Sequence, residues 1–352
     1  SSFFVDIDSY VMANGKPNYP SQGEISRLYN LCDSGDFIGA ENFCRKLLAN
    51  FPAAPEVSKI LGVALGAQGK TQDALNIFSE TIRSNPDYPD VYLNFGLLLN
   101  SLGRREEAIE NFRKAAELDP EWGDAQNNLG VMLQNQDRHE EALPHLEKAI
   151  KLSPENPASY FNYANSLKVL GENQEALKNY NQAVKLHPSF PVAFNNRGNL
   201  LESMGKIEDA KRSFSRAIEL DRNYARAYSN RGIAERKLGN HSNALRDFSK
   251  ALELEPWQPD NPNQDSNFQF RMYINLGDIY LYLKEFNRAL EAYDRAQEIE
   301  PDNQDILGFK SNAVAGLGKL EEGLQLRQQS YGMVSFDRTK GVPTASTGIV
   351  TP

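Results

Sequence analysis

The sequence is poor in the residues that form cross-links and metal sites. It contains two cysteines, Cys32 and Cys44, and four histidines in 352 residues. A structural zinc site takes about four ligands, and a small disulfide-rich domain needs several bridges. We therefore interpret both cysteines as structural thiols and expect neither a metal nor another cofactor.

Long apolar runs are also absent. No stretch approaches the roughly 18 uninterrupted apolar residues that a membrane-spanning helix needs. The first residues show no basic region followed by an apolar core, as a signal peptide would. We therefore expect a soluble, cytoplasmic chain with no membrane span.

Positive charge is in deficit. The chain has 38 Lys and Arg against 47 Asp and Glu, which gives a net charge of -9. Proteins that coat nucleic acid neutralise phosphates with clustered Lys and Arg, so we expect no nucleic-acid partner. Glycine and proline occur at ordinary globular levels, which excludes collagen-like and low-complexity chains.

Motifs for catalysis are missing as well. The chain has no His-Glu-x-x-His, no Gly-x-Ser-x-Gly and no glycine-rich phosphate loop. Acidic pairs recur before alanine, where we expect helices to begin and the acids to complement the helix dipole. These acids are Glu106, Glu107, Glu140, Glu141, Glu208 and Asp209. We predict no catalytic residues and no enzyme activity.

What the sequence does contain is a period of 34 residues. Prolines recur at this step or twice this step, at Pro52, Pro86, Pro120, Pro154, Pro188 and Pro256. With proline as position 32 of a unit, position 8 is almost always Gly, position 20 Ala, and position 24 aromatic or Leu. A Gly near position 15 is suited to ending a helix in the left-handed conformation. Such a unit is predicted to be a helical hairpin, with small residues at 8 and 20 where two helix backbones approach.

This pattern resembles the tetratricopeptide repeat family. The resemblance implies an all-α fold, a right-handed superhelical solenoid of helix-turn-helix repeats. Eight clear repeats start near residues 21, 55, 89, 123, 157, 191, 225 and 270, and a degenerate ninth carries Ser311 and Gly323 at positions 8 and 20. We expect an N-terminal extension over 1–20, the solenoid over 21–335 and a polar tail over 336–352.

The period breaks once, by an insertion of eleven residues. The segment 257–269 is rich in Pro, Asn and Asp, which favour turns, so we expect a loop. It is either a tolerated surface insertion or a loop that folds over the groove or docks a partner through Trp257. At the ends, Phe3, Phe4, Tyr10 and Tyr19 are candidates for a cap on the first repeat. The run 333–336 is either part of a mobile tail or the first strand of a following domain.

In this family the first helix of each repeat lines the concave face, with positions 2, 6, 9 and 13 pointing inward. Position 6 is asparagine in six consecutive repeats, at Asn94, Asn128, Asn162, Asn196, Asn230 and Asn275. An asparagine amide matches the donor and acceptor of a peptide group. The row resembles the one lining the repeats of O-GlcNAc transferase, which implies a track for an extended peptide. The alternative is that these side chains satisfy neighbouring backbone groups.

Other groove positions extend this hypothesis. Position 9 adds Asn165 and Asn199, and position 2 changes from acidic in the early repeats to basic at Arg226 and Arg271. The early acids are Glu56, Asp90 and Asp124. A bound segment is therefore expected to place its basic part near repeats two to four and its acidic part near repeats seven and eight. The alternative is that these are scattered surface charges.

The clamp that some family members use for chaperone tails is incomplete here. Asn199, Asn230 and Arg271 match three of its five positions, but Asn195 stands where the clamp has Lys and Asn275 where it has Arg. Binding of a chaperone tail is therefore not the favoured hypothesis.

The sequence favours a non-enzymatic scaffold that binds a protein or peptide partner in its concave groove. We expect a monomer or a subunit of a larger complex. Two alternatives remain open: the repeats are the substrate-recruiting arm of a longer enzyme, such as a glycosyltransferase, or an assembly factor that uses its convex face and tails.

Overall fold

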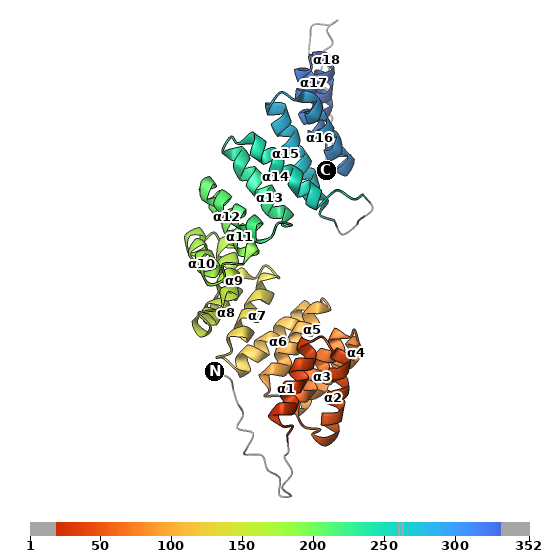
Figure 1. The fold of residues 1–352 in the computed structure, drawn as a ribbon, viewed down its shortest axis with the longest axis vertical. Helices are drawn as coiled ribbons and strands as arrows, with labels where there is room; N and C mark the ends of the chain where they lie inside the picture. The colour runs from red at the N-terminus through yellow and green to blue at the C-terminus, as the bar shows by residue number, and fades with distance from the viewer. Residues whose placement is uncertain (1–18, 260, 262–263, 332–352) are drawn as a thin grey trace, which may run out of the picture. The chain divides into compact units, whose positions relative to one another are not determined.

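The computed structural model describes residues 19–259, 261 and 264–331 (Figure 1). These residues form eighteen α-helices and no strand. They belong to two compact units, residues 1–186 and 187–352. None of the described helices is both long and apolar enough to cross a membrane.

The first unit contains five helical hairpins that stack in chain order (Figure 1). Its helices are α1 (Gln22–Asp33), α2 (Phe37–Asn50), α3 (Pro55–Ala67), α4 (Thr71–Ser84), α5 (Pro89–Ser101), α6 (Arg105–Leu118), α7 (Gly123–Gln134), α8 (His139–Leu152), α9 (Pro157–Val169) and α10 (Asn173–Leu186). Each odd-numbered helix pairs with the next even-numbered one, and each hairpin packs on the following hairpin.

The second unit contains four hairpins of the same kind. Its helices are α11 (Pro191–Ser203), α12 (Ile207–Leu220), α13 (Ala225–Lys237), α14 (His241–Leu254), α15 (Ser266–Tyr282), α16 (Phe286–Ile299), α17 (Asp305–Gly316) and α18 (Leu320–Tyr331). The all-α, repeated-hairpin fold expected from the sequence is therefore confirmed in both units.

Helix ends follow the repeat pattern. Seven first helices are followed by a glycine with a φ between 73° and 85°, at Gly35, Gly69, Gly103, Gly171, Gly205, Gly239 and Gly318. This left-handed conformation is cheap only for glycine. In the fourth and eighth repeats Asp137 and Lys284 adopt it instead, with φ values of 55° and 61°.

The core is built between the two helices of each hairpin. A Cβ added to Gly198 would lie 2.4 Å from Cε1 of Phe214, and one added to Gly277 would lie 2.3 Å from Cε1 of Tyr293. The small residue at position 8 thus makes room for the side chain at position 24, rather than for a helix backbone as expected. In the ninth hairpin a Cβ on Gly323 would lie 2.8 Å from the Ser311 carbonyl oxygen, so there the backbones do approach closely.

The loop in the inserted segment is shorter than the predicted loop over 257–269. Helix α15 begins at Ser266, so residues 266–269 are helical and not part of the loop. Asp265 caps this extra turn by accepting a hydrogen bond from the Phe268 backbone N–H. Phe268 and Gln269 are buried, and Trp257 in the loop is half-buried. Burial of Phe268 stabilises a turn that the composition of the segment does not favour.

Little of the predicted terminal extensions falls within the described residues. Tyr19 is half-buried and packs against the apolar core of the first two repeats. Its hydroxyl donates a hydrogen bond to Glu56 over 3.4 Å. Phe3, Phe4 and Tyr10 lie outside the described residues, as do the run 333–336 and the tail.

Candidate peptide-binding groove

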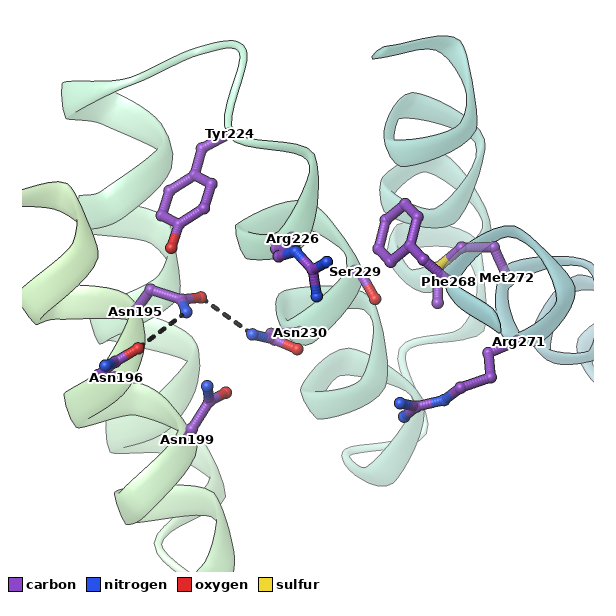
Figure 2. A pocket seen from close by; sticks show the side chains of 10 residues that line it. All are labelled: Asn195, Asn196, Asn199, Tyr224, Arg226, Ser229, Asn230, Phe268, Arg271 and Met272. Carbon is purple, nitrogen blue, oxygen red and sulfur yellow. Dashed lines mark hydrogen bonds between the residues drawn. The ribbon is translucent and has the colours of Figure 1, made fainter. Parts of the chain in front are cut away.

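Three successive first helices of the second unit line one pocket. Helices α11, α13 and α15, with the residue before α13, enclose about 300 Å³. Figure 2 shows these side chains facing a common space. The lining residues are Asn195, Asn196, Asn199, Tyr224, Arg226, Ser229, Asn230, Phe268, Arg271 and Met272. We call this site the α11–α13–α15 pocket.

Amide side chains form one wall of this pocket. Nδ2 of Asn230 donates to Oδ1 of Asn195 over 2.9 Å, and Nδ2 of Asn195 donates to Oδ1 of Asn196 over 3.5 Å (Figure 2). Asn195 is buried and holds its neighbours in place. Asn199, one turn further along α11, makes no side-chain hydrogen bond within the described part of the chain, so its amide is available to a ligand.

Two arginines supply positive charge. A terminal nitrogen of Arg226 lies 2.8 Å from Oδ2 of Asp265, and its guanidinium lies 5.7 Å from the centre of the Phe268 ring. Arg271 is exposed and forms no ion pair with the residues that the structure describes. The pocket therefore holds one arginine that is already paired and one that is open.

The remaining lining side chains are largely apolar. Phe268 and Met272 are buried on α15, and Tyr224 is half-buried, which raises the pKa of its phenol. A site with amides, guanidinium groups and an aromatic wall can bind peptide groups and acidic side chains.

The structure brings together five of the predicted site residues: Asn196, Asn199, Asn230, Arg226 and Arg271. Asn275, from α15, is buried and does not line the pocket. Asn94, Asn128, Asn162 and Asn165 belong to the first unit.

In the first unit the predicted asparagines bond largely within the protein. Nδ2 of Asn94 donates to the Asp90 carbonyl oxygen over 2.8 Å, and Nδ2 of Asn162 donates to Oδ1 of Asn127 over 3.1 Å. Asn165 accepts a hydrogen bond from the Tyr180 hydroxyl over 2.6 Å. Asn128 is half-buried and makes no side-chain hydrogen bond to any described residue. Position 6 thus has a structural role as well as any binding role.

Sequence reasoning considered position 5 only through Asn195, as a mismatch to the chaperone clamp, and missed its role in bonding to the next repeat. This position supplies Asn127 and Asn195, each of which accepts the amide hydrogen of the position-6 asparagine in the next repeat. Position 5 lies about one helical turn before position 9, so the two positions share a helix face. The repeat spacing alone could therefore have identified position 5 as a groove position. Tyr224, Ser229, Phe268 and Met272 were also missed, and only the packed repeats bring them to the pocket.

The charge gradient predicted along the groove is altered by internal pairing. Glu56 accepts a hydrogen bond from the Tyr29 hydroxyl over 2.9 Å, and Asp90 lies 3.2 Å from Nζ of Lys59. Of the three early acids, Asp124 alone is exposed with no ion pair to a described residue. The expected site for a basic segment is therefore weaker than the position-2 pattern suggests.

Five of the six acids that recur at helix starts form ion pairs. Glu107 pairs with Arg104 over 2.6 Å, and Glu141 with Arg138 over 2.7 Å. No group of three or more His, Cys, Asp or Glu side chains that could hold a metal occurs in the described residues. Cys32 and Cys44 are free, and burial raises the pKa of the Cys44 thiol to about 12. A thiol with so high a pKa is a poor nucleophile.

Solved structures of helical-repeat proteins are similar to this chain. The APC/C heterotetramer Cut9–Hcn1 is 19% identical, with 87% of this chain and 58% of that chain covered and a TM-score of 0.56. A tetratricopeptide repeat protein from Parabacteroides merdae is 19% identical, covering 72% and 98%, with a TM-score of 0.52. PilF of Pseudomonas aeruginosa is 21% identical, covering 63% and 96%, with a TM-score of 0.54. These similarities show the fold.

Sequence profiles identify the same repeat. Three profiles, each described as tetratricopeptide repeat, match residues 61–121, then 123–188, and then 191–224, 225–257 and 270–303. Comparison with curated protein sequences gives no match. Because the profiles together match well over half of the chain, and their repeats coincide with the helical hairpins, the chain belongs to the tetratricopeptide repeat family.

Proposed function

We propose that this chain is a non-catalytic scaffold that binds an extended, acidic segment of a partner protein in the α11–α13–α15 pocket. The observation that carries the proposal is the meeting of side-chain amides, two arginines and an aromatic wall on three successive helices. Such a site recognises backbone and charge together, which suits an extended peptide better than a small apolar ligand.

The amides would hold the backbone of the segment. Asn230 uses one amide hydrogen on Asn195 and keeps its oxygen for a peptide N–H, while Asn199 offers both a donor and an acceptor. Neighbouring helices lie roughly 10 Å apart, and an extended chain rises about 3.3 Å per residue. Each repeat would therefore meet about every third residue of the segment. The asparagines of the first unit are proposed to make similar contacts there.

The arginines would select acidic side chains. A guanidinium group presents paired N–H donors that match the two oxygens of a carboxylate. Arg271 is exposed and open for such a contact, whereas Glu56 and Asp90 in the first unit are already engaged by Tyr29 and Lys59. The proposal therefore keeps the acidic part of the predicted segment and does not require the basic part.

The test uses a fluorescein-labelled peptide of four Glu-Ser repeats with blocked ends, measured by fluorescence anisotropy. Asn199→Ala removes one free amide and is expected to lower the affinity by about 0.5 to 1.5 kcal/mol. Arg271→Gln is expected to lower it by about 0.5 to 1 kcal/mol, because Arg271 is exposed and solvent screens its ion pair with the peptide.

The matched control is Arg246→Gln. Arg246 is exposed on α14, outside the pocket, and its substitution removes the same charge. Equal losses in Arg246→Gln and Arg271→Gln would show that only overall charge matters and would overturn the proposal. Circular dichroism would verify that helicity is unchanged in each variant.

A further inference from the structure

The insertion brings an acidic side chain of the chain itself onto one arginine of the pocket. Asp265 ends the inserted segment, and its Oδ2 accepts a hydrogen bond from Arg226 over 2.8 Å. Its Oδ1 lies 3.2 Å from the Phe268 backbone nitrogen, which donates to it. One carboxylate thus caps α15 and pairs with α13 at the same time.

The surroundings of Arg226 are those of a bound carboxylate site. Phe268 lies against the guanidinium group, with 5.7 Å to the ring centre, while Asp265 occupies the donor edge. In Figure 2 Arg226 and Arg271 project from α13 and α15 into the same pocket. Arg271 carries no acidic partner among the described residues, so Arg226 is the arginine of the pocket that Asp265 occupies.

We propose that Asp265 is an internal competitor that occupies the place of a partner's carboxylate on Arg226. This inference rests on the proposed function, because it concerns the same pocket and the same acidic partner. The repeat pattern alone would leave both arginines open, and the inserted residues supply the competing acid. Asp265 thereby lowers the affinity of the pocket for acidic segments.

The ion pair is weak enough to be displaced. The side chains of Arg226 and Asp265 are 56% and 45% exposed, and ion pairs with such exposure contribute little. A segment with two acidic side chains can engage Arg271 with one and displace Asp265 from Arg226 with the other. A segment with a single acid gains only the contact with Arg271, so the competitor favours partners with clustered acids.

Asp265→Asn tests this directly, since asparagine keeps the oxygen that caps α15 and loses the charge. With the labelled Glu-Ser peptide at low salt, we expect about a two- to fivefold gain in affinity, the range for an exposed ion pair. Asp305→Asn is the control. Asp305 is an exposed acid on α17, outside the pocket, and its removal changes the net charge equally.

A double-mutant cycle with Arg226→Gln completes the test. Asp265→Asn should have no effect on affinity once Arg226 is absent. The inference is overturned if Asp265→Asn leaves the affinity unchanged, if Asp305→Asn gives the same gain, or if the gain persists in the Arg226→Gln background. In each of these cases Arg271-dependent binding by the unmodified chain would leave the proposed function standing. If neither the unmodified chain nor Asp265→Asn binds the peptide, the proposed function fails together with the inference.

Discussion

At the scale of single residues, the glycine at position 8 determines how closely the two helices of a hairpin pack. Without a Cβ, it leaves space for the ring or leucine at position 24, as between Gly198 and Phe214. The fifth repeat has Ala164 instead, beside a fully buried Tyr180. The sequence predicts the small residue at position 8, but its contact with position 24 follows only from the packed structure.

Gly198→Ala should destabilise the second unit. The added Cβ would lie 2.4 Å from Phe214, and overpacking a core costs about 1 to 3 kcal/mol, of which the better helix propensity of alanine offsets up to about 1 kcal/mol. Gly23→Ala is the control, because no atom lies within 4 Å of a Cβ at that position. Urea unfolding should show a loss for Gly198→Ala and none for Gly23→Ala. Equal behaviour of the two variants would contradict the packing account.

Glu41 links the first two repeats through charge. Its carboxylate accepts hydrogen bonds from Lys70 over 2.6 Å, from Gln68 over 3.0 Å and from Arg45 over 3.0 Å. The bond from Lys70, with those from Gln68 and Arg45, lowers the pKa of Glu41 from 4.5 to about 2. A depressed pKa means that this stabilisation is present above about pH 4.5 and is lost as the pH falls towards 2.

Glu41→Gln should therefore be less stable than the unmodified chain at pH 6, and the gap should narrow by pH 3. Urea unfolding at the two pH values measures it, with exposed Glu110→Gln as the control. A gap that stays constant with pH would show that Glu41 stabilises the repeats by packing alone.

Side-chain amides show where residue-scale prediction reaches its limit. The sequence identifies asparagine at position 6, but it does not reveal which way each amide points. Asn230 turns one amide hydrogen to Asn195, whereas Asn94 turns one to its own helix backbone. These choices depend on the position-5 residue of the preceding repeat and on the contact between helices, both of which require the packed structure.

At the scale of elements, the turn after each first helix is the most regular feature. Seven repeats place glycine in the left-handed conformation, while Asp137 and Lys284 adopt it in the other two. The 34-residue register predicts this turn even where glycine is missing. The start of α15 was not predicted, because the Asn- and Asp-rich segment favours turns and only burial of Phe268 stabilises the extra helical turn.

Lys284→Gly should stabilise the eighth repeat. A residue other than glycine with a φ of 61° carries a strain of about 1 to 2 kcal/mol, partly offset by the greater flexibility of glycine in the unfolded chain. We expect a net gain of about 0.5 to 1 kcal/mol in thermal or urea unfolding. Gly205→Lys makes the reverse change and should cost a similar amount; a loss for Lys284→Gly would contradict the strain argument.

At the scale of the whole molecule, each unit is a stack in which a hairpin contacts its neighbours along the chain. Stability in such a stack is close to a sum of repeat and nearest-neighbour contributions. The sequence predicted the repeats themselves because their core positions recur every 34 residues. It did not predict the pocket, which takes residues from three repeats and from the end of an insertion.

Ala142→Leu should loosen the first unit locally. Ala142 is fully buried in α8, between α7 and α9, and overpacking there costs about 1 to 3 kcal/mol. Hydrogen exchange should accelerate in α7, α8 and α9 before it changes in α1 to α4. Exposed Ala53→Leu is the control, and uniform loss of protection across the unit would contradict the nearest-neighbour description.

The most direct test of the central claim is a reversal of charge preference. The chain has a net charge of -9, so non-specific attraction favours a basic peptide, whereas the pocket should favour an acidic one. Anisotropy titrations at physiological salt would compare Glu-Ser and Lys-Ser peptides on the unmodified chain and on the double variant Arg226→Glu, Arg271→Glu. We predict tighter binding of the acidic peptide by the unmodified chain and of the basic peptide by the double variant. A preference that is the same in both proteins would contradict the claim that these arginines and the α11–α13–α15 pocket bind the partner.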